Sequence, residues 1–207
     1  MSLYQRAFAR LMALGDGRQH QLYGARKTAL FADLAGTVVE IGPGSGVNLP
    51  YYPPGLRWIG IEPNPHMHPF IREQAARHGL DAALRTTTAG DLGLPDASAD
   101  AVVSTLVLCS VPSVEAALAE VQRVLRPGGR LLFIEHVAAP EGTGLRRYQR
   151  AIRPLWKLLA DGCRPDRETH RLIDAAGFAE VHYDHFDLPI PAAAVVRPHI
   201  IGTAVRR

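Results

Sequence analysis

The sequence predicts an α/β fold with a doubly wound, mostly parallel sheet of about seven strands, an antiparallel pair of strands at the C-terminal edge and a lid of N-terminal helices. Two patterns support this prediction. Short apolar runs rich in Val and Ile alternate with segments of helical spacing, as expected for parallel strands joined by crossover helices. The last two strand-like runs have no helix between them, which favours antiparallel pairing.

Length and composition indicate one domain over residues 1–207, with a helical lid at 1–35 and the core at 36–207. No apolar run approaches the length of a membrane span, so we expect no integral span. The net charge of +3 comes from basic residues interspersed with acidic ones, and nucleic acid is not expected as a partner. The two cysteines favour free thiols and a cytoplasmic location. The oligomeric state is left open.

The chain begins with two predicted helices. Residues 1–17 place apolar side chains at helical spacing with arginines between them, which suits a helix packed on the domain or, less commonly, a membrane surface. The second helix continues to about Leu34. In it, Tyr23 and Arg26 lie about one turn apart, so both side chains can point at a site that the helices cover.

The core elements then follow in order. The predicted strands are TVVEI (37–41), RWIGIE (57–62), AALRT (82–86), DAVVSTLVL (100–108) and RLLFIEHV (130–137), followed after two more helices by FAEVHYDHFDLP (178–189) and HIIGTAVRR (199–207). The predicted helices are residues 68–79, 114–129, 144–162 and 165–177. Ser113 can cap the helix at 114–129, and Pro127-Gly128-Gly129 should end it.

A glycine-rich turn follows the first strand. Gly42, Gly44 and Gly46 let the backbone approach a ligand at a helix N-terminus, where amide groups are free. Their spacing differs from that of dinucleotide-binding loops, and Glu40 beside them would repel a pyrophosphate and attract a cation. Glu62, at the end of the next strand, can accept both hydroxyls of a ribose. These residues predict a ligand with a ribose and a positive charge, and S-adenosylmethionine (SAM) has both.

Several motifs resemble the class I SAM-dependent methyltransferases of small molecules, which have a Rossmann-like sheet. They are VEIGPGSG, GIEPN, LPDASADAVVSTLVLCSV and EVQRVLRPGGRLLFIEH. Within that family, YYPPG, PNP, TLVLCSV, RVLRPGG, EHVAA, DGC and VRPHI are most similar to the mammalian thiol S-methyltransferase group, also called methyltransferase-like protein 7. The resemblance covers nearly everything from Val38 onward. It implies S-methylation of a small-molecule thiol, with S-adenosylhomocysteine as the second product.

The resemblance also implies the cofactor contacts. The residues that it places against SAM are Glu40, Gly42, Gly44, Gly46, Glu62, Pro63, Asn64, Thr88, Ala89, Leu106 and Cys109. Among them, Glu40 and the glycines would hold the methionine portion. Many relatives have an acid at the adenine, where this chain has Thr88, with Asp91 a little further on. The mammalian proteins carry an N-terminal hydrophobic anchor that we do not expect in this chain.

On the acceptor side, the predicted catalytic residues are His136 and Asp161, and the predicted acceptor contacts are Tyr23, Ser110, Trp156, Cys163, Arg197 and His199. His136 could act as a base or hydrogen-bond the backbone to shape the pocket. Asp161 could help to close a lid or simply end a turn. Arg197 could line the pocket or pair with an acid of the edge helix. We expect no metal, because Cys109 and Cys163 lack the spacing of metal ligands.

Other functions share part of this pattern. O- or N-methylation, including that of a phospholipid headgroup, would use the same cofactor half. A noncatalytic SAM-binding protein is a further alternative. A nicotinamide-dependent oxidoreductase is disfavoured by Glu40 and by the spacing of the glycines.

Overall fold

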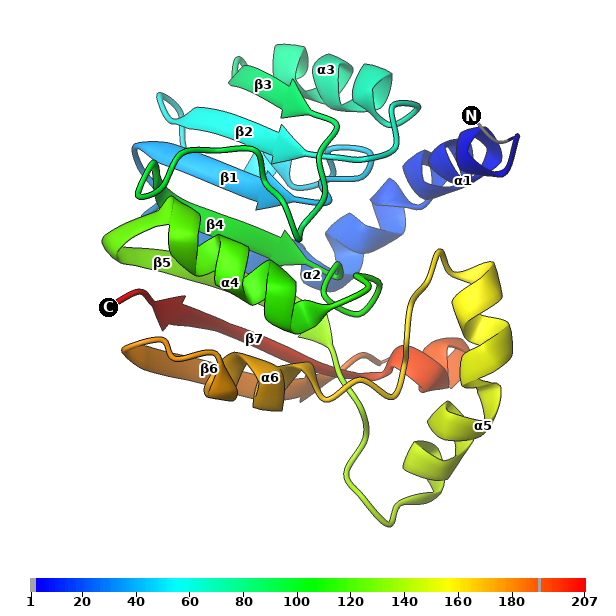
Figure 1. Ribbon diagram of the computed structural model, residues 1–207. Helices are drawn as coiled ribbons and strands as arrows, with labels where there is room; N and C mark the ends of the chain where they lie inside the picture. The colour runs from blue at the N-terminus through cyan, green and yellow to red at the C-terminus, as the bar shows by residue number, and fades with distance from the viewer. Residues whose placement is uncertain (1–2, 190) are drawn as a thin grey trace.

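A computed structural model describes residues 3–189 and 191–207. In these residues a seven-stranded sheet has the order β3-β2-β1-β4-β5-β7-β6 (Figure 1). The strands are β1 (Thr37–Ile41), β2 (Arg57–Ile61), β3 (Asp81–Arg85), β4 (Ala99–Thr105), β5 (Leu125–His136), β6 (Glu180–Asp187) and β7 (Pro198–Val205). Strands β1 to β5 pair in parallel, and β7 pairs antiparallel with both β5 and β6. The predicted α/β fold and the antiparallel pair are confirmed.

Helices lie on both faces of this sheet. The described helices are α1 (Leu3–Leu14), α2 (Asp16–Phe31), α3 (His68–Arg77), α4 (Val114–Val124), α5 (Gly144–Leu159) and α6 (Thr169–Ala175), with short 3-10 turns η1 (Leu49–Tyr51) and η2 (Pro191–Val196). Helix α5 lies beyond the carboxyl ends of the strands and not on a face of the sheet (Figure 1). One apolar core joins the sheet to α4 and α6, and a second joins the opposite face to α1, α2 and α3. Alternating strand residues supply the two cores: Val39 lies in the first, and Val38 in the second.

Several element boundaries differ from the sequence prediction, and two of them have a clear local cause. Strand β4 ends at Thr105 because Leu106 has a φ of 60°, which no extended strand residue adopts. Helix α4 ends at Val124, before the Pro-Gly-Gly sequence, because Leu125 is extended and pairs with Ala99. At its start, the predicted cap is confirmed: the Ser113 side chain accepts a hydrogen bond from the amide of Ala116 at 3.1 Å.

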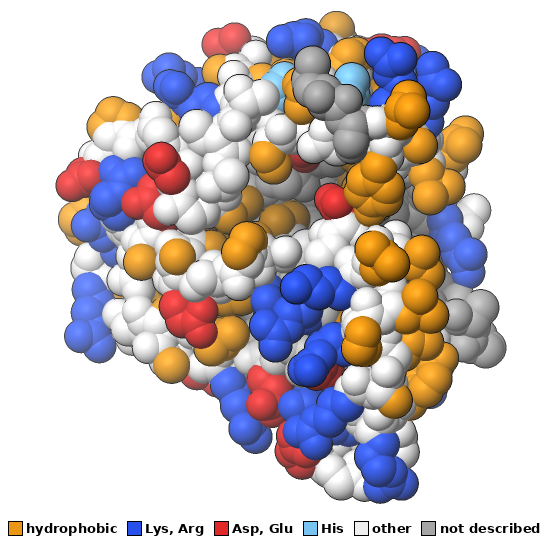
Figure 2. Space-filling model, turned by 45° about the vertical axis from the view of Figure 1, so that its right-hand side comes forward, with side chains coloured by type: hydrophobic (Ala, Val, Ile, Leu, Met, Phe, Trp, Pro, Cys, Tyr) orange, Lys and Arg blue, Asp and Glu red, His pale blue; other side chains and the backbone are white. Residues whose placement is uncertain are grey.

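Helix α5 has an unusual distribution of side chains. Its buried residues are polar: Gln149 accepts a hydrogen bond from the amide of Ala139 and donates to the carbonyl of Val195, both at 2.8 Å. Large apolar side chains lie on its exposed side, namely Tyr148, Leu155, Leu158 and Leu159. Figure 2 shows hydrophobic side chains gathered on this side of the molecule next to a group of Lys and Arg side chains. Among the described helices, none combines the length and hydropathy needed to span a bilayer.

Candidate functional site

The glycine loop follows β1 in the chain and packs against the turn that follows β4. Gly42, Gly44 and Gly46 all have positive φ, as the loop conformation requires. A Cβ atom on Gly42 would lie 2.8 Å from Cγ2 of Val107, whereas one on Gly44 would meet no heavy atom within 4 Å. Gly42 therefore allows close packing of two loops, and Gly44 faces open space in which a ligand can approach the backbone.

Glu62 lies beside this loop, just past the end of β2. One carboxylate oxygen accepts a hydrogen bond from the amide of Gly44 at 3.1 Å, and the other from the amide of Asn64 at 2.9 Å. Each oxygen keeps a further lone pair. Burial raises the pKa of Glu62 to about 7, and the charge of Asp161 adds to the shift. A buried carboxylate that can accept two more hydrogen bonds fits the hydroxyls of a ribose.

Glu40 is held by side chains of the segment that follows the glycine loop. Its carboxylate is fully buried and accepts hydrogen bonds from Nδ2 of Asn48 at 2.8 Å, the hydroxyl of Tyr52 at 2.8 Å and Nε1 of Trp58 at 3.0 Å. Burial raises the pKa of Glu40, and these donors act in the opposite direction. Its surroundings favour a role in holding residues 48–58 behind the glycine loop over direct contact with the ammonium group of SAM.

The N-terminal helices contact the same loops. Asp16 of α2 accepts a hydrogen bond from the hydroxyl of Ser45 at 2.6 Å, and Asn64 donates to the carbonyl of Gln5 in α1 at 3.1 Å. Lys27 of α2 is fully buried, and burial lowers its pKa to about 8. Helices α1 and α2 thus lie against both sides of the predicted cofactor site.

Tyr23 connects α2 to β7. Its hydroxyl lies 2.8 Å from Nε2 of His199, and Nδ1 of His199 lies 3.0 Å from the carbonyl of Arg197. Because a carbonyl only accepts, Nδ1 carries the proton and Nε2 accepts from Tyr23. Burial lowers the pKa of His199 to about 4, so this imidazole is neutral at pH 7. On the adjacent strand β5, His136 is the residue that pairs with His199 in the β5–β7 register.

Two basic residues predicted near the site have other partners. The guanidinium group of Arg26 lies 4.1 Å from the ring centroid of Phe186, which is a stacking contact. Arg197 forms an ion pair of 3.1 Å with Asp187, at the end of a strand and not on the edge helix. The side chain of Arg197 is therefore engaged at the surface, and its backbone carbonyl contacts His199.

Three residues that are distant in sequence meet at the carboxyl ends of β4 and β5. The ligand-capable atoms of Cys109, His136 and Cys163 lie within 4.8 Å of one another, and all three side chains are buried. Nε2 of His136 lies 3.1 Å from Sγ of Cys163, and Nε1 of Trp156 donates to the same sulfur at 3.3 Å. The hydrogen bond from the Cys109 thiol lowers the pKa of Cys163, and His136 lowers it further. The fold thus joins four predicted site residues in one cluster.

Buried polar contacts hold this cluster in place. Glu135 faces β4, where its Oε1 accepts hydrogen bonds from the hydroxyl of Ser104 at 2.7 Å and from two backbone amides of the turn after β4. The buried guanidinium of Arg167 donates to two carbonyls of the same turn. Leu106 belongs to the same turn and has the positive φ described above. These contacts stabilise a strained backbone at the edge of the predicted cofactor site.

The other predicted residues lie around this centre. Ser110 places its hydroxyl 3.5 Å from Sγ of Cys109. Asp161 has a φ of 46° and contributes to the pKa shift of Glu62. Thr88 is exposed and forms an isolated bridge with Asp91, and its neighbour Ala89 is buried. Pro63 is also exposed.

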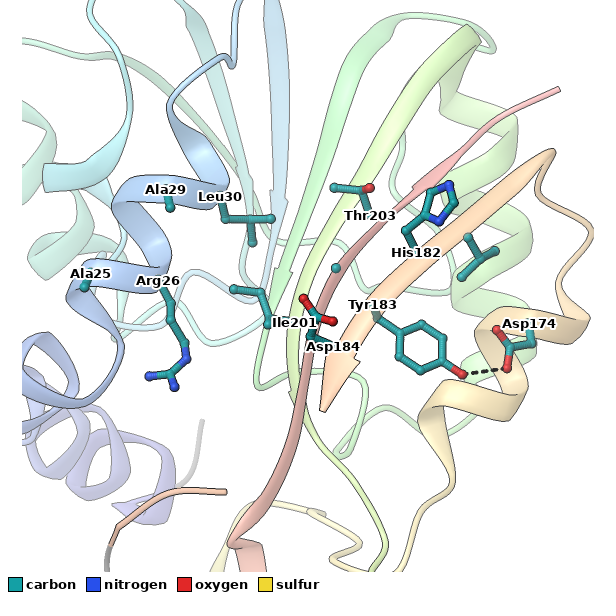
Figure 3. A pocket seen from close by; sticks show the side chains of 12 residues that line it. Ala25, Arg26, Ala29, Leu30, Asp174, His182, Tyr183, Asp184, Ile201 and Thr203 are labelled. Atoms are coloured by element: carbon teal, nitrogen blue, oxygen red, sulfur yellow. Dashed lines mark hydrogen bonds between the residues drawn. The ribbon is translucent and has the colours of Figure 1, made fainter. Parts of the chain in front are cut away.

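A separate cavity lies beside the edge strands. It has a volume of about 970 Å³ and is bordered by α2, α6, β6 and β7 (Figure 3). Arg26 and Asp184 line it, and the hydroxyl of Tyr183 donates to Asp174 at 2.9 Å. Apart from Arg26, none of the residues predicted to contact the cofactor or the acceptor lines this cavity. It is therefore an open groove beside the edge strands, separate from the glycine loop.

Sequence reasoning missed several residues that build the site. Those that hold its parts together are Lys27, Asn48, Tyr52, Trp58 and Arg167. One signal was present: the segment YYPPG contains Tyr52, but it served only as a family motif. A buried charge such as that of Lys27 cannot be recognised from helical spacing alone.

The raised pKa of Glu62 predicts a pH-dependent affinity for SAM. Hydroxyl donors need the ionised carboxylate, so the affinity should rise roughly tenfold between about pH 6 and pH 8, with release of a proton on binding. Without SAM, the raised pKa stabilises the fold fully below pH 4.5, and this contribution is lost as the pH rises through about 7. Calorimetry in buffers of different ionisation enthalpy measures the proton; an affinity that does not change with pH would contradict the assignment.

The fold and the site define a class I SAM-dependent methyltransferase. Comparison with known proteins narrows this class. Residues 39–133 match the family described as a methyltransferase domain. Thiol S-methyltransferase TMT1B of Rattus norvegicus is 40% identical over 211 residues, which cover 96% of this chain and 86% of the relative. Thiol S-methyltransferase TMT1A of Homo sapiens is 40% identical over 193 residues, which cover 88% of this chain and 79% of the relative.

Solved structures agree on the fold. A SAM-dependent methyltransferase of Thermotoga maritima, described as a possible histamine N-methyltransferase, superposes with a TM-score of 0.71 at 21% identity and covers 98% of both chains. The chain belongs to the thiol S-methyltransferase family that includes TMT1A and TMT1B. The resemblance indicated by the sequence motifs is confirmed.

Proposed function

We propose that this enzyme transfers the methyl group of SAM to the sulfur of a small-molecule thiol. The observation that carries the proposal is the 40% identity to thiol S-methyltransferases over 96% of the chain. The cluster of Cys109, His136 and Cys163 supports it. Its two soft sulfur atoms and its imidazole lie at the carboxyl ends of β4 and β5, on the predicted acceptor side of the site.

Each part of the site has a role in this reaction. SAM, when bound, supplies a methyl group that its positive sulfonium already activates. Glu62 accepts the ribose hydroxyls, and the open backbone at Gly44 admits the methionine portion. The lid helices α1 and α2 exclude water from the site. The acceptor thiol, with an ordinary pKa of about 8.5, needs only modest help to lose its proton, and the cluster around His136 is the group placed to give it.

The acceptor can be identified by a competition among nucleophiles. The enzyme is incubated with SAM and, separately, with aliphatic thiols, alcohols, phenols and amines, and S-adenosylhomocysteine is measured. We expect turnover with thiols and little with the other classes. Turnover of phenols or amines without turnover of thiols would contradict S-methylation and favour O- or N-methylation by the same cofactor half.

A further inference from the structure

The buried cluster at the acceptor edge has the composition of a metal site. We propose that Cys109, His136 and Cys163 bind one zinc ion and that the fourth coordination position takes the sulfur of the acceptor thiol. Thiolate and imidazole are preferred zinc ligands, and three protein ligands with one open position are typical of catalytic zinc. The ion site stands on the geometry of these side chains, and the role of its fourth position rests on the proposed function.

The distances fit a tetrahedral ion. The three ligand-capable atoms lie within 4.8 Å of one another, with His136 Nε2 at 3.1 Å from Cys163 Sγ. Around tetrahedral zinc, with bonds of about 2.0–2.3 Å, such atoms are roughly 3.3–3.8 Å apart. Small side-chain rotations therefore suffice to close the site on an ion.

Neighbouring groups suit sulfur ligands. The indole N–H of Trp156 donates to Cys163 Sγ at 3.3 Å, and the hydroxyl of Ser110 lies 3.5 Å from Cys109 Sγ. Donors of this kind stabilise the charge on metal-bound sulfur. The amide of Arg164 donates to the carbonyl of Cys109 at 3.0 Å, which links the two cysteine-bearing segments. These hydrogen bonds within the chain therefore position the sulfur atoms of Cys109 and Cys163.

His136 indicates how firmly the ion would be held. Its Nδ1 atom is buried and has no hydrogen-bond partner in residues 3–189 and 191–207. Metal-bound histidines usually donate this second N–H, and loss of such a partner typically lowers metal affinity about 10- to 100-fold. We therefore expect an ion that a chelator removes without unfolding the chain.

The cluster lies next to the glycine loop, where SAM is predicted to bind. The turn that carries Cys109 also carries Val107, against which Gly42 of the glycine loop packs. A thiol that binds zinc releases its proton to solvent and remains as a thiolate. Its sulfur then forms a bond to the methyl carbon while the bond from that carbon to the sulfonium sulfur breaks, and the electron pair stays on the departing sulfur. The thioether product is neutral and dissociates, and zinc is neither oxidised nor reduced. In this reaction His136 is a ligand and not a base.

Metal binding can be tested without measuring activity. The full chain is reduced with a phosphine, stripped with EDTA and titrated with Co²⁺ and then Zn²⁺. We expect one ion per chain, a thiolate-to-cobalt absorption that Zn²⁺ abolishes, and a higher Tm with Zn²⁺. C109S, C163S and H136A should each weaken binding about tenfold or more, and H182A, which changes an exposed histidine of β6, should not. If C163S does not fold, the metal affinity of C109S is compared with that of the wild type instead. The site is overturned if the wild type binds no stoichiometric ion, or if all three variants bind as the wild type does.

A second measurement tests the role of the ion. Thiol methylation by the EDTA-treated enzyme should fall about tenfold or more and recover with Zn²⁺. Full activity of the metal-free enzyme would overturn coordination of the acceptor while leaving S-methylation intact. An enzyme that binds Zn²⁺ and SAM but methylates no thiol would overturn the proposed function and leave the zinc site standing.

Discussion

Replacing Glu62 with alanine is expected to weaken SAM binding by at least about 100-fold, because the two ribose hydroxyls lose a charged acceptor, and hydrogen bonds to charged groups contribute about 1.5–3 kcal/mol each. The fold should survive, since the two donors that Glu62 now receives are backbone amides at an accessible loop. Calorimetric titration with SAM and with S-adenosylhomocysteine measures the effect.

Two further variants make this result interpretable. E62Q keeps one acceptor oxygen and should bind SAM with intermediate affinity. E73A removes an exposed carboxylate of α3 that pairs with Arg77, and it should bind SAM as the wild type does. If E62A binds SAM with unchanged affinity, the ribose is held by another group.

Replacing Glu40 with alanine is expected to lower the free energy of unfolding by about 3–5 kcal/mol. The buried donors of Asn48, Tyr52 and Trp58 would lose their acceptor, at a cost of about 1–3 kcal/mol each. That loss is a large share of the roughly 5–15 kcal/mol by which domains are stable. Urea denaturation followed by fluorescence measures it, since Trp58 lies at the site of the change.

The matched variants separate structure from cofactor contact. Y52F removes a single donor and should cost about 1 kcal/mol. E40Q keeps an acceptor of the same size, and its stability should lie between those of E40A and the wild type. If E40Q instead retains the full stability and loses most of its SAM affinity, Glu40 contacts the ammonium group directly, as the sequence predicts.

The fold was accessible from the sequence because its signals are local. Strands and helices alternate at a period that each segment shows by itself, and the Ser113 cap depends on an amide only three residues away. The place of Glu62 beside the glycine loop could be predicted for the same reason, since the end of a strand fixes where its side chain lies. Family motifs then identified the enzyme class.

The site was harder to predict from the sequence because it depends on contacts between distant segments. Glu40 receives donors from residues 8, 12 and 18 positions further along the chain, and no local pattern shows that its side chain faces them. Cys109 and Cys163 lack metal spacing in sequence, yet the turn after β4 and the segment after α5 bring them to His136. Sequence spacing detects a metal site only when one segment supplies several ligands.

The position of β7 between β5 and β6 has a consequence for biosynthesis. A nascent chain can pair β1 to β5 in parallel as soon as β5 has emerged from the ribosome, but β6 finds no neighbour until β7 is made. The contact between Tyr23 and His199, which spans 176 residues, must wait for the same event. Such nonlocal pairing slows folding. Until β7 is made, the partly synthesised protein exposes the open edge of β5, which chaperones would need to protect.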